Sequence, residues 1–188
     1  SSISHAGFVM AAILIGTTQA NTGLFLYWAL FSFTNLGAFT MLWVNRQKNL
    51  LPGQSSDHPY EKFSGMVKTM PMAALMMGLF MLSLAGIPPF GLFWGKMYMI
   101  GSAVSAGYTL LALIMALNSA IAGYYYLKLI VFMFMKEPMV GYERYYLMNA
   151  SLSLKTIIGI AAVGTIFAVF AVNPLLEVIT LFVYNSGY

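Results

Sequence analysis

Long apolar segments that almost lack charged residues occupy most of this chain. Hydrophobic residues make up 60% of it and charged residues only 7%, whereas a soluble domain carries about 25% charged residues. The apolar segments approach the ~20 residues that cross the hydrocarbon core of a bilayer as a helix. The sequence therefore predicts an all-α polytopic membrane helix bundle and argues against a soluble enzyme.

The apolar pattern predicts about six transmembrane helices in a single bundle spanning residues 1–188, including a proline-broken helix. The predicted helices cover residues 2–16, 22–44, 65–84, 90 to about 101–107, 108–135 and 152–183. The last is expected to bend or break near Asn173 and Pro174. As one helix, residues 65–106 would be about 60 Å long, twice a bilayer core. We therefore expect two passes there, or one pass plus a broken one.

The polar loops do not by themselves reveal the orientation of the bundle. With this helix count, segments 46–68 and 136–155 lie on opposite sides of the membrane and carry four and three basic residues. The positive-inside rule does not separate such similar numbers. The chain begins at Ser1 without an initiator Met or a basic segment, so no signal peptide is indicated. We expect it to be part of a longer protein.

The sequence lacks the residues and motifs that several classes of chemistry require. There is no cysteine, which excludes disulfides and thiolate-bound metals or clusters. No Walker loop, no dinucleotide-binding glycine pattern after a strand and no His/Asp/Glu metal cluster occurs. The basic residues are scattered, so nucleic acid is not an expected partner. We predict no bound cofactor or metal, and any redox role would be indirect.

Lys96 is the most informative residue, because it follows Pro88 and Pro89 by about two turns within an apolar segment. A lysine in a membrane segment usually faces protein or water and marks an ion pathway. A broken helix must likewise be buried in protein or line a cavity. Desolvation and the positive end of the helix that starts near Phe90 would both help the side chain to release its proton. The alternative is a lysine that snorkels to the headgroups.

A second polar stripe is predicted on residues 108–135. Asn118, Tyr125 and Lys128 are spaced seven and three residues apart and so fall near one helix face. They are predicted to point into the bundle and to hydrate a path from Lys96. Since Lys128 is only about two turns from the helix end, snorkelling explains it equally well.

His5 is a candidate proton relay, because a membrane histidine titrates near neutral pH. The alternative is a hydrogen-bonded core histidine. Thr34 and Asn35 lie in the middle of residues 22–44, where hydrogen bonding to a neighbouring helix is the simpler interpretation.

Four stretches resemble a known family. LSLAGIPPFGLFWGK at 82–96 is similar to a signature of the antiporter-like, proton-pumping membrane subunits of respiratory complex I, the NADH–quinone oxidoreductase. SSISHAGF at 1–8, FTNLGAF at 33–39 and LNSAIAGYYYLKL at 117–129 narrow the resemblance to the subunit N branch. The resemblance covers nearly the whole chain, but only the C-terminal part of such a subunit. LAGIPP with GK alone is shared with multisubunit cation/proton antiporters.

The resemblance implies a role for several residues. Lys96 matches the lysine on the family's discontinuous helix, which exchanges protons with the outer side. His5 lies just after the position of the family's central-axis lysine. Asn35 stands where related pumping subunits have a lysine, and Lys128 where the N type often has an arginine. The first half-channel is missing, so this chain alone would not be a complete pump.

The sequence thus predicts a non-redox, proton-conducting subunit of complex I, in a bacterial inner membrane in preference to a mitochondrial one. The resemblance implies other membrane subunits, including neighbouring antiporter-like subunits, as partners, together with the lipid bilayer. Two alternatives remain at this point, a cation/proton antiporter subunit and a structural scaffold with an inactive path.

Overall fold

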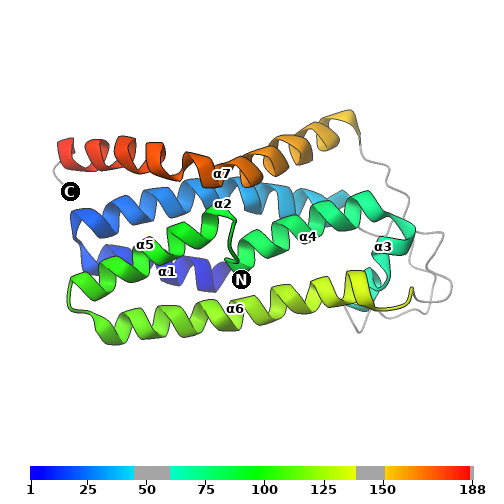
Figure 1. The fold of residues 1–188 in the computed structure, drawn as a ribbon, viewed down its shortest axis with the longest axis horizontal. Helices are drawn as coiled ribbons and strands as arrows, with labels where there is room; N and C mark the ends of the chain where they lie inside the picture. Colours follow the sequence, from blue (N-terminus) through cyan, green and yellow to red (C-terminus); the bar gives the residue numbers. More distant parts are fainter. Residues whose placement is uncertain (45–59, 139–150, 187–188) are drawn as a thin grey trace.

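The computed structural model describes residues 1–44, 60–138 and 151–186, so most of the two predicted polar loops lies outside the described residues. The elements are α1 (Ser2–Ile15), α2 (Thr18–Val44), the short 3₁₀ helix η1 (Glu61–Phe63), α3 (Met66–Thr69), α4 (Pro71–Ala85), α5 (Gly91–Ser105), α6 (Thr109–Met135) and α7 (Leu152–Asn185). No strand occurs in the described ranges. The predicted all-α bundle is confirmed (Figure 1).

Three helices are long and apolar enough to cross a membrane unaided, namely α2, α6 and α7. α1, with 14 residues, is about 21 Å long and falls short of a core about 30 Å thick. Large apolar side chains such as Leu110, Ile121 and Phe170 are 65 to 76% exposed. An outer surface of this kind is expected where lipid or another membrane protein covers the bundle.

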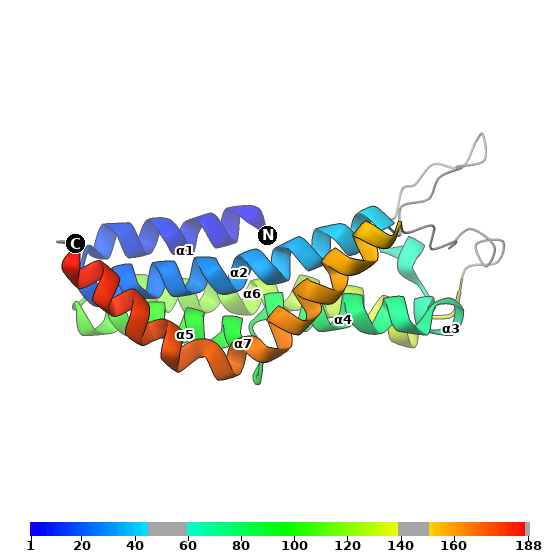
Figure 2. The same cartoon turned by 90° about the horizontal axis from the view of Figure 1, so that it is seen from above.

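α4 and α5 form the predicted proline-broken helix. They lie end to end along the bundle and are separated by a short segment near its middle (Figure 1 and Figure 2). Each has 15 residues, so together they span about 45 Å and make one interrupted crossing. α4 starts at Pro71, a favoured first helical position. The sequence prediction merged α3 and α4 into one helix starting at residue 65.

The collinear arrangement corrects the predicted topology. Because α4 and α5 make one crossing, α2 and α6 end at the same end of the bundle (Figure 1). An ion pair of 2.6 Å joins Lys68 on α3 to Glu137 just after α6. The described parts of segments 46–68 and 136–155 therefore lie at the same end, and the prediction that these segments lie on opposite sides was wrong. We call this end, which carries Lys62, Lys68, Lys136 and Lys155, the cation-rich end.

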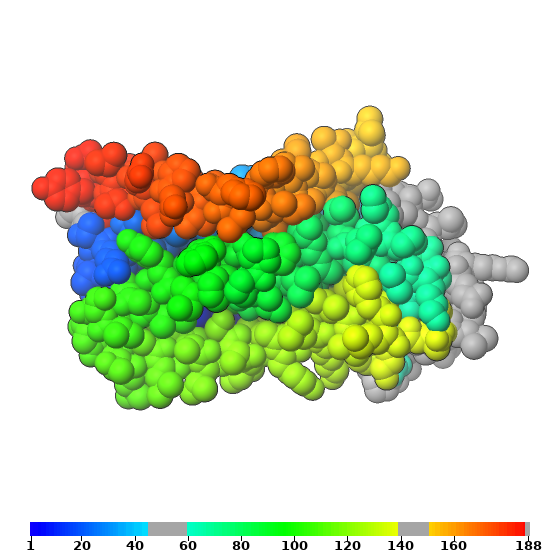
Figure 3. Space-filling view, in the orientation of Figure 1, coloured from blue at the N-terminus to red at the C-terminus, as the bar shows by residue number. Residues whose placement is uncertain are grey.

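α2 is the central helix and packs against α1, α4, α5 and α7. α7 lies along one edge of the bundle (Figure 3). It is continuous through Pro174 but clearly bent (Figure 2), so of the two predicted outcomes the bend is the one observed. A proline inside a helix removes one backbone hydrogen bond and clashes with the preceding turn, which explains a bend.

Candidate functional site

The break between α4 and α5 leaves two carbonyl groups without their helical donors. In a continuous helix the carbonyls of Leu84 and Ala85 would accept hydrogen bonds from the amides four residues later, but those residues are Pro88 and Pro89, which have no N–H. Lys96 Nζ donates to both carbonyls instead, at 3.0 Å to Leu84 O and 3.3 Å to Ala85 O. The lysine side chain thus replaces the donors that the prolines lack.

The Lys96 side chain is buried inside the bundle, with 4% of its surface exposed. The predicted break within reach of Lys96 is confirmed, and the snorkelling alternative is not observed. The ammonium contacts the C-terminal, negative end of α4, and not the positive end of α5 on which the sequence interpretation relied. No carboxylate in the described ranges forms an ion pair with it. Its hydrogen-bond acceptors in the described part of the chain are two backbone carbonyls.

Gly86 completes the binding site for the ammonium. It ends α4 with φ +77°, a left-handed conformation that favours glycine. A Cβ atom at this position would lie 3.0 Å from Lys96 Nζ and 3.1 Å from its Cδ. The absence of a side chain here lets the lysine lie directly against the turn.

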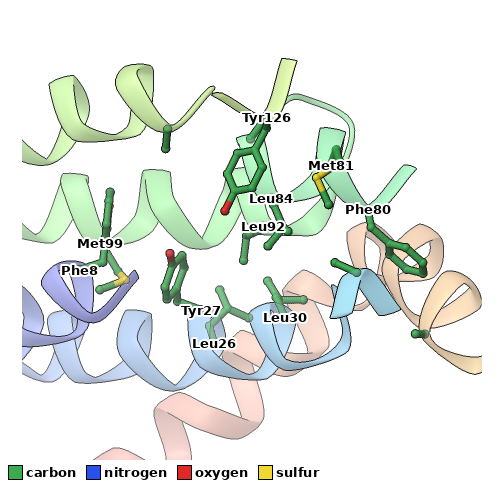
Figure 4. Packing of buried hydrophobic residues seen from close by; sticks show 14 of the residues in the cluster. Phe8, Leu26, Tyr27, Leu30, Phe80, Met81, Leu84, Leu92, Met99 and Tyr126 are labelled. Atoms are coloured by element: carbon green, nitrogen blue, oxygen red, sulfur yellow. The ribbon is translucent and has the colours of Figure 1, made fainter. Parts of the chain in front are cut away.

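A histidine–tyrosine cluster lies in the same region. His5, 3% exposed, forms hydrogen bonds through Nδ1 to the Tyr27 hydroxyl and through Nε2, at 3.2 Å, to the Tyr126 hydroxyl. Figure 4 shows these two hydroxyls pointing from α2 and α6 toward the same space. Tyr126 also bonds to Ser1 Oγ. The cluster therefore links α1, α2 and α6 through side chains alone.

This cluster is close to the lysine. An added Cβ at Gly95 would lie 3.3 Å from Tyr27 Cα, so α2 and α5 approach closely one residue before Lys96. The sequence prediction named His5 but missed Tyr27 and Tyr126 as its partners.

A cavity of about 230 Å³ lies between α2, α4 and α6. It is lined by Ser1, Asn35, Ala38, Phe39, Leu42, Tyr60, Met77, Met81, Leu84, Tyr125, Tyr126 and Leu129. The Tyr125 hydroxyl is buried and has no hydrogen-bond partner in the part of the chain described. Since water occupies about 30 Å³ and needs polar partners, the cavity can hold several molecules near its tyrosine and asparagine groups.

The three residues of the predicted stripe on α6 have different surroundings. Asn118 donates to Ser4 Oγ on α1 at 2.9 Å, and Tyr125 lines the cavity. Lys128 is half-buried and places Nζ 5.1 Å from the centre of the Tyr60 ring at the cation-rich end. That distance fits a cation–π contact. The three residues therefore follow one side of α6 from α1 toward the cation-rich end.

Metal-binding groups do not gather in the described residues, where no set of three or more His, Cys, Asp or Glu side chains could hold an ion. The buried polar groups are instead amines, imidazole, phenols and hydroxyls. Groups of this kind exchange protons or orient water.

Comparison with known proteins identifies the family. The family described as NADH:quinone oxidoreductase/Mrp antiporter, TM, matches residues 1–122. NADH-quinone oxidoreductase subunit N of Sulfurimonas denitrificans is 75% identical over the whole chain, and that of Sulfurovum sp. is 54% identical. The chain spans 38% of the length of each of these curated relatives.

Solved structures share the fold. A chain of respiratory complex I from Thermus thermophilus with bound aureothin is similar with a TM-score of 0.74 and 25% identity, covering 94% of this chain and 38% of that one. A chain of the Mrp complex from Dietzia sp. matches with a TM-score of 0.73 at 17% identity, covering 96% of this chain and 40% of that one. The chain belongs to the NADH:quinone oxidoreductase/Mrp antiporter transmembrane family.

Proposed function

We propose that this chain is the C-terminal part of subunit N of NADH–quinone oxidoreductase and conducts protons in that complex. The observation that carries the proposal is the buried Lys96 ammonium, held by the carbonyls of Leu84 and Ala85 at a broken helix. Quinone reduction would take place in other subunits and supply the energy. The protein would be a non-redox subunit of a translocase.

The chemistry of the lysine supports proton exchange. Without a carboxylate partner, Lys96 can release a proton and leave only neutral groups behind, so no buried charge of opposite sign is stranded. The two carbonyls stabilise the ammonium when the proton returns. A group held in this way can alternate between its charged and neutral forms as its surroundings change.

The path proposed for the proton uses the groups around the lysine. His5 with Tyr27 and Tyr126 offers a hydrogen-bonded chain next to α5. The cavity, whose lining includes Leu84, Tyr125 and Tyr60, offers room for water. In this proposal Tyr125 orients that water, Asn118 fixes α1 against α6, and Lys128 stands near the cation-rich end.

The charge distribution supports an orientation. Lys62, Lys68, Lys136 and Lys155 lie at the cation-rich end, whereas the described turns at the other end, 16–17 and 106–108, carry no charged residue. Short loops rich in lysine and arginine remain on the cytoplasmic side. We therefore place the cation-rich end in the cytoplasm and the chain in a bacterial inner membrane, with other membrane subunits of the complex, including antiporter-like ones, as partners.

The second candidate function is that of a subunit in a multisubunit cation/proton antiporter. It is favoured by the similarity of the fold to a chain of the Mrp complex. The two candidates share Lys96 and differ in what drives the protons.

Purification from the native membrane tests this choice. The affinity-tagged full-length protein is expected to co-purify with NADH-oxidising subunits, and the purified complex is expected to pump protons when NADH and quinone are supplied after reconstitution. Co-purification with small membrane antiporter subunits alone, together with sodium-dependent and NADH-independent proton movement, would contradict the proposal.

A further inference from the structure

Three hydroxyl groups from three helices meet in the interior beside the lysine site. Thr34 Oγ1 on α2 lies 3.2 Å from Ser83 Oγ on α4 and 3.4 Å from Thr165 Oγ1 on α7. The three side chains are between 1 and 2% exposed. We call Thr34, Ser83 and Thr165 the hydroxyl cluster. None of them belongs to the path described above.

The cluster is attached directly to the carbonyl groups that hold the lysine. Ser83 immediately precedes Leu84 and Ala85, the two acceptors of Lys96 Nζ. The carbonyl of Ser83 accepts from the amide of Gly86 at 2.9 Å. Ser83 is thus held at two points, by its hydroxyl to Thr34 on α2 and by its carbonyl to the turn that contacts the lysine.

The end of α4 gains a further attachment in this way. The prolines remove two helical hydrogen bonds there, and the amides of Gly86 and Ile87 together with Lys96 Nζ bond to its last carbonyls instead. The hydroxyl cluster links this end to α2 and α7. Thr34 Oγ1 also donates to the Leu30 carbonyl of its own helix at 3.3 Å. A buried Ser83 or Thr165 hydroxyl that lost Thr34 would have no other partner among the described residues, which favours the observed arrangement.

We infer that the hydroxyl cluster is a positioning site for Lys96. By fixing Ser83 it would set the distance between the ammonium and the carbonyls of Leu84 and Ala85, and so the ease with which the lysine gives up its proton. Through Thr165, the ease with which Lys96 releases its proton would also depend on the position of α7. This inference rests on the proposed proton-carrying role of Lys96.

Substitutions that remove a hydroxyl test the inference in the assembled complex. Ser83→Ala, Thr34→Val and Thr165→Val are compared with two controls that are equally buried. Ser102→Ala removes a hydroxyl that bonds only to the Met99 carbonyl of its own helix. Thr22→Val removes a hydroxyl that has no partner among the described residues. NADH-driven proton uptake by membrane vesicles is measured as a function of pH.

We expect the cluster variants to move the pH of half-maximal uptake by about half a unit, less than the loss of a hydrogen bond to Lys96 itself would cause, because the cluster acts on the lysine only through the position of Ser83. The two controls are expected to keep the wild-type pH profile. Thr34→Ser, which keeps the hydroxyl that Thr34→Val removes, is expected to show the wild-type pH profile. If one cluster variant fails to assemble, the other two provide the same test.

A fall in uptake with an unchanged pH profile would show a merely structural role and overturn the inference, as would wild-type behaviour of all three variants. The Lys96→Ala variant separates this result from failure of the proposed function. If Lys96→Ala abolishes uptake while the cluster variants keep the wild-type profile, only the positioning role is wrong. If Lys96→Ala pumps normally, the proposed function itself fails.

Discussion

At the scale of single residues, the lysine site consists of two carbonyls that lack their helical donors and one ammonium group that donates to both. Pro88 and Pro89 free the carbonyls of Leu84 and Ala85, and Lys96 Nζ bonds to both. The freed carbonyls can be located in the sequence, because they lie four residues before the prolines, but the sequence interpretation did not predict that Lys96 bonds to them. The partners of His5 could not be found in this way. Tyr27 and Tyr126 are 22 and 121 residues away along the chain, and only the packing of three helices brings them together.

Gly86→Ala is expected to impair proton uptake more than its strain alone explains. A left-handed residue with a Cβ costs about 1–2 kcal/mol, and here that atom would also press on the Lys96 side chain. Gly107→Ala is the matched control, since Gly107 has φ +84° but nothing within 4 Å of an added Cβ. Thermal stability and NADH-driven uptake of both variants are measured. Equal losses of uptake would show that displacement of the ammonium is unimportant.

Tyr126→Phe is expected to lower proton uptake several-fold without preventing assembly. The change leaves the buried His5 Nε2 without its partner among the described residues, and an unsatisfied buried polar group costs about 1–3 kcal/mol. Tyr124→Phe is the control, because Tyr124 is 69% exposed. Uptake per assembled complex is the measurement. A variant with normal uptake would remove the histidine–tyrosine cluster from the path.

At the scale of secondary-structure elements, the sequence predicted six of the helical segments and the break near residues 85–90. It missed the separate start of α4 at Pro71, because only Met70 separates α4 from the short helix α3. It also expected two passes, or one pass plus a broken one, over residues 65–106, and so was wrong about how many times α4 and α5 cross the bundle. Segment length alone does not decide that question, which depends on the direction in which the chain leaves the turn after Gly86. The same uncertainty caused the error about the sides of the two polar loops.

The double substitution Pro88→Ala with Pro89→Ala tests the role of the break. It restores two amide donors, which would compete with Lys96 Nζ for the carbonyls of Leu84 and Ala85. We expect the complex to assemble and proton uptake to fall, because the ammonium loses its acceptors. Pro174→Ala on α7 is the comparison, since Pro174 is distant from these carbonyls in sequence and lies inside a continuous helix. Normal uptake by the double variant would contradict the proposed role of the break.

At the scale of the whole molecule, the proposed orientation of the bundle in the membrane can be tested, because the described lysines gather at the cation-rich end. This chain has no cysteine, so single cysteines can be introduced as reporters once any cysteine elsewhere in the full-length protein is replaced. A membrane-impermeant maleimide is expected to label Lys136→Cys in inverted vesicles and Tyr108→Cys in right-side-out vesicles. The reverse pattern would place the cation-rich end outside the cytoplasm.

The most direct test of the whole account is proton uptake by inverted vesicles whose assembled complex carries Lys96→Ala. Acid–base groups in transfer steps typically contribute a hundredfold or more, so uptake driven by NADH is expected to fall by at least about tenfold. Lys96→Arg is expected to fail as well, since a guanidinium scarcely releases its proton. Lys155→Ala, at an exposed site, is expected to pump normally. Wild-type uptake by an assembled Lys96→Ala complex would contradict the central role of this lysine.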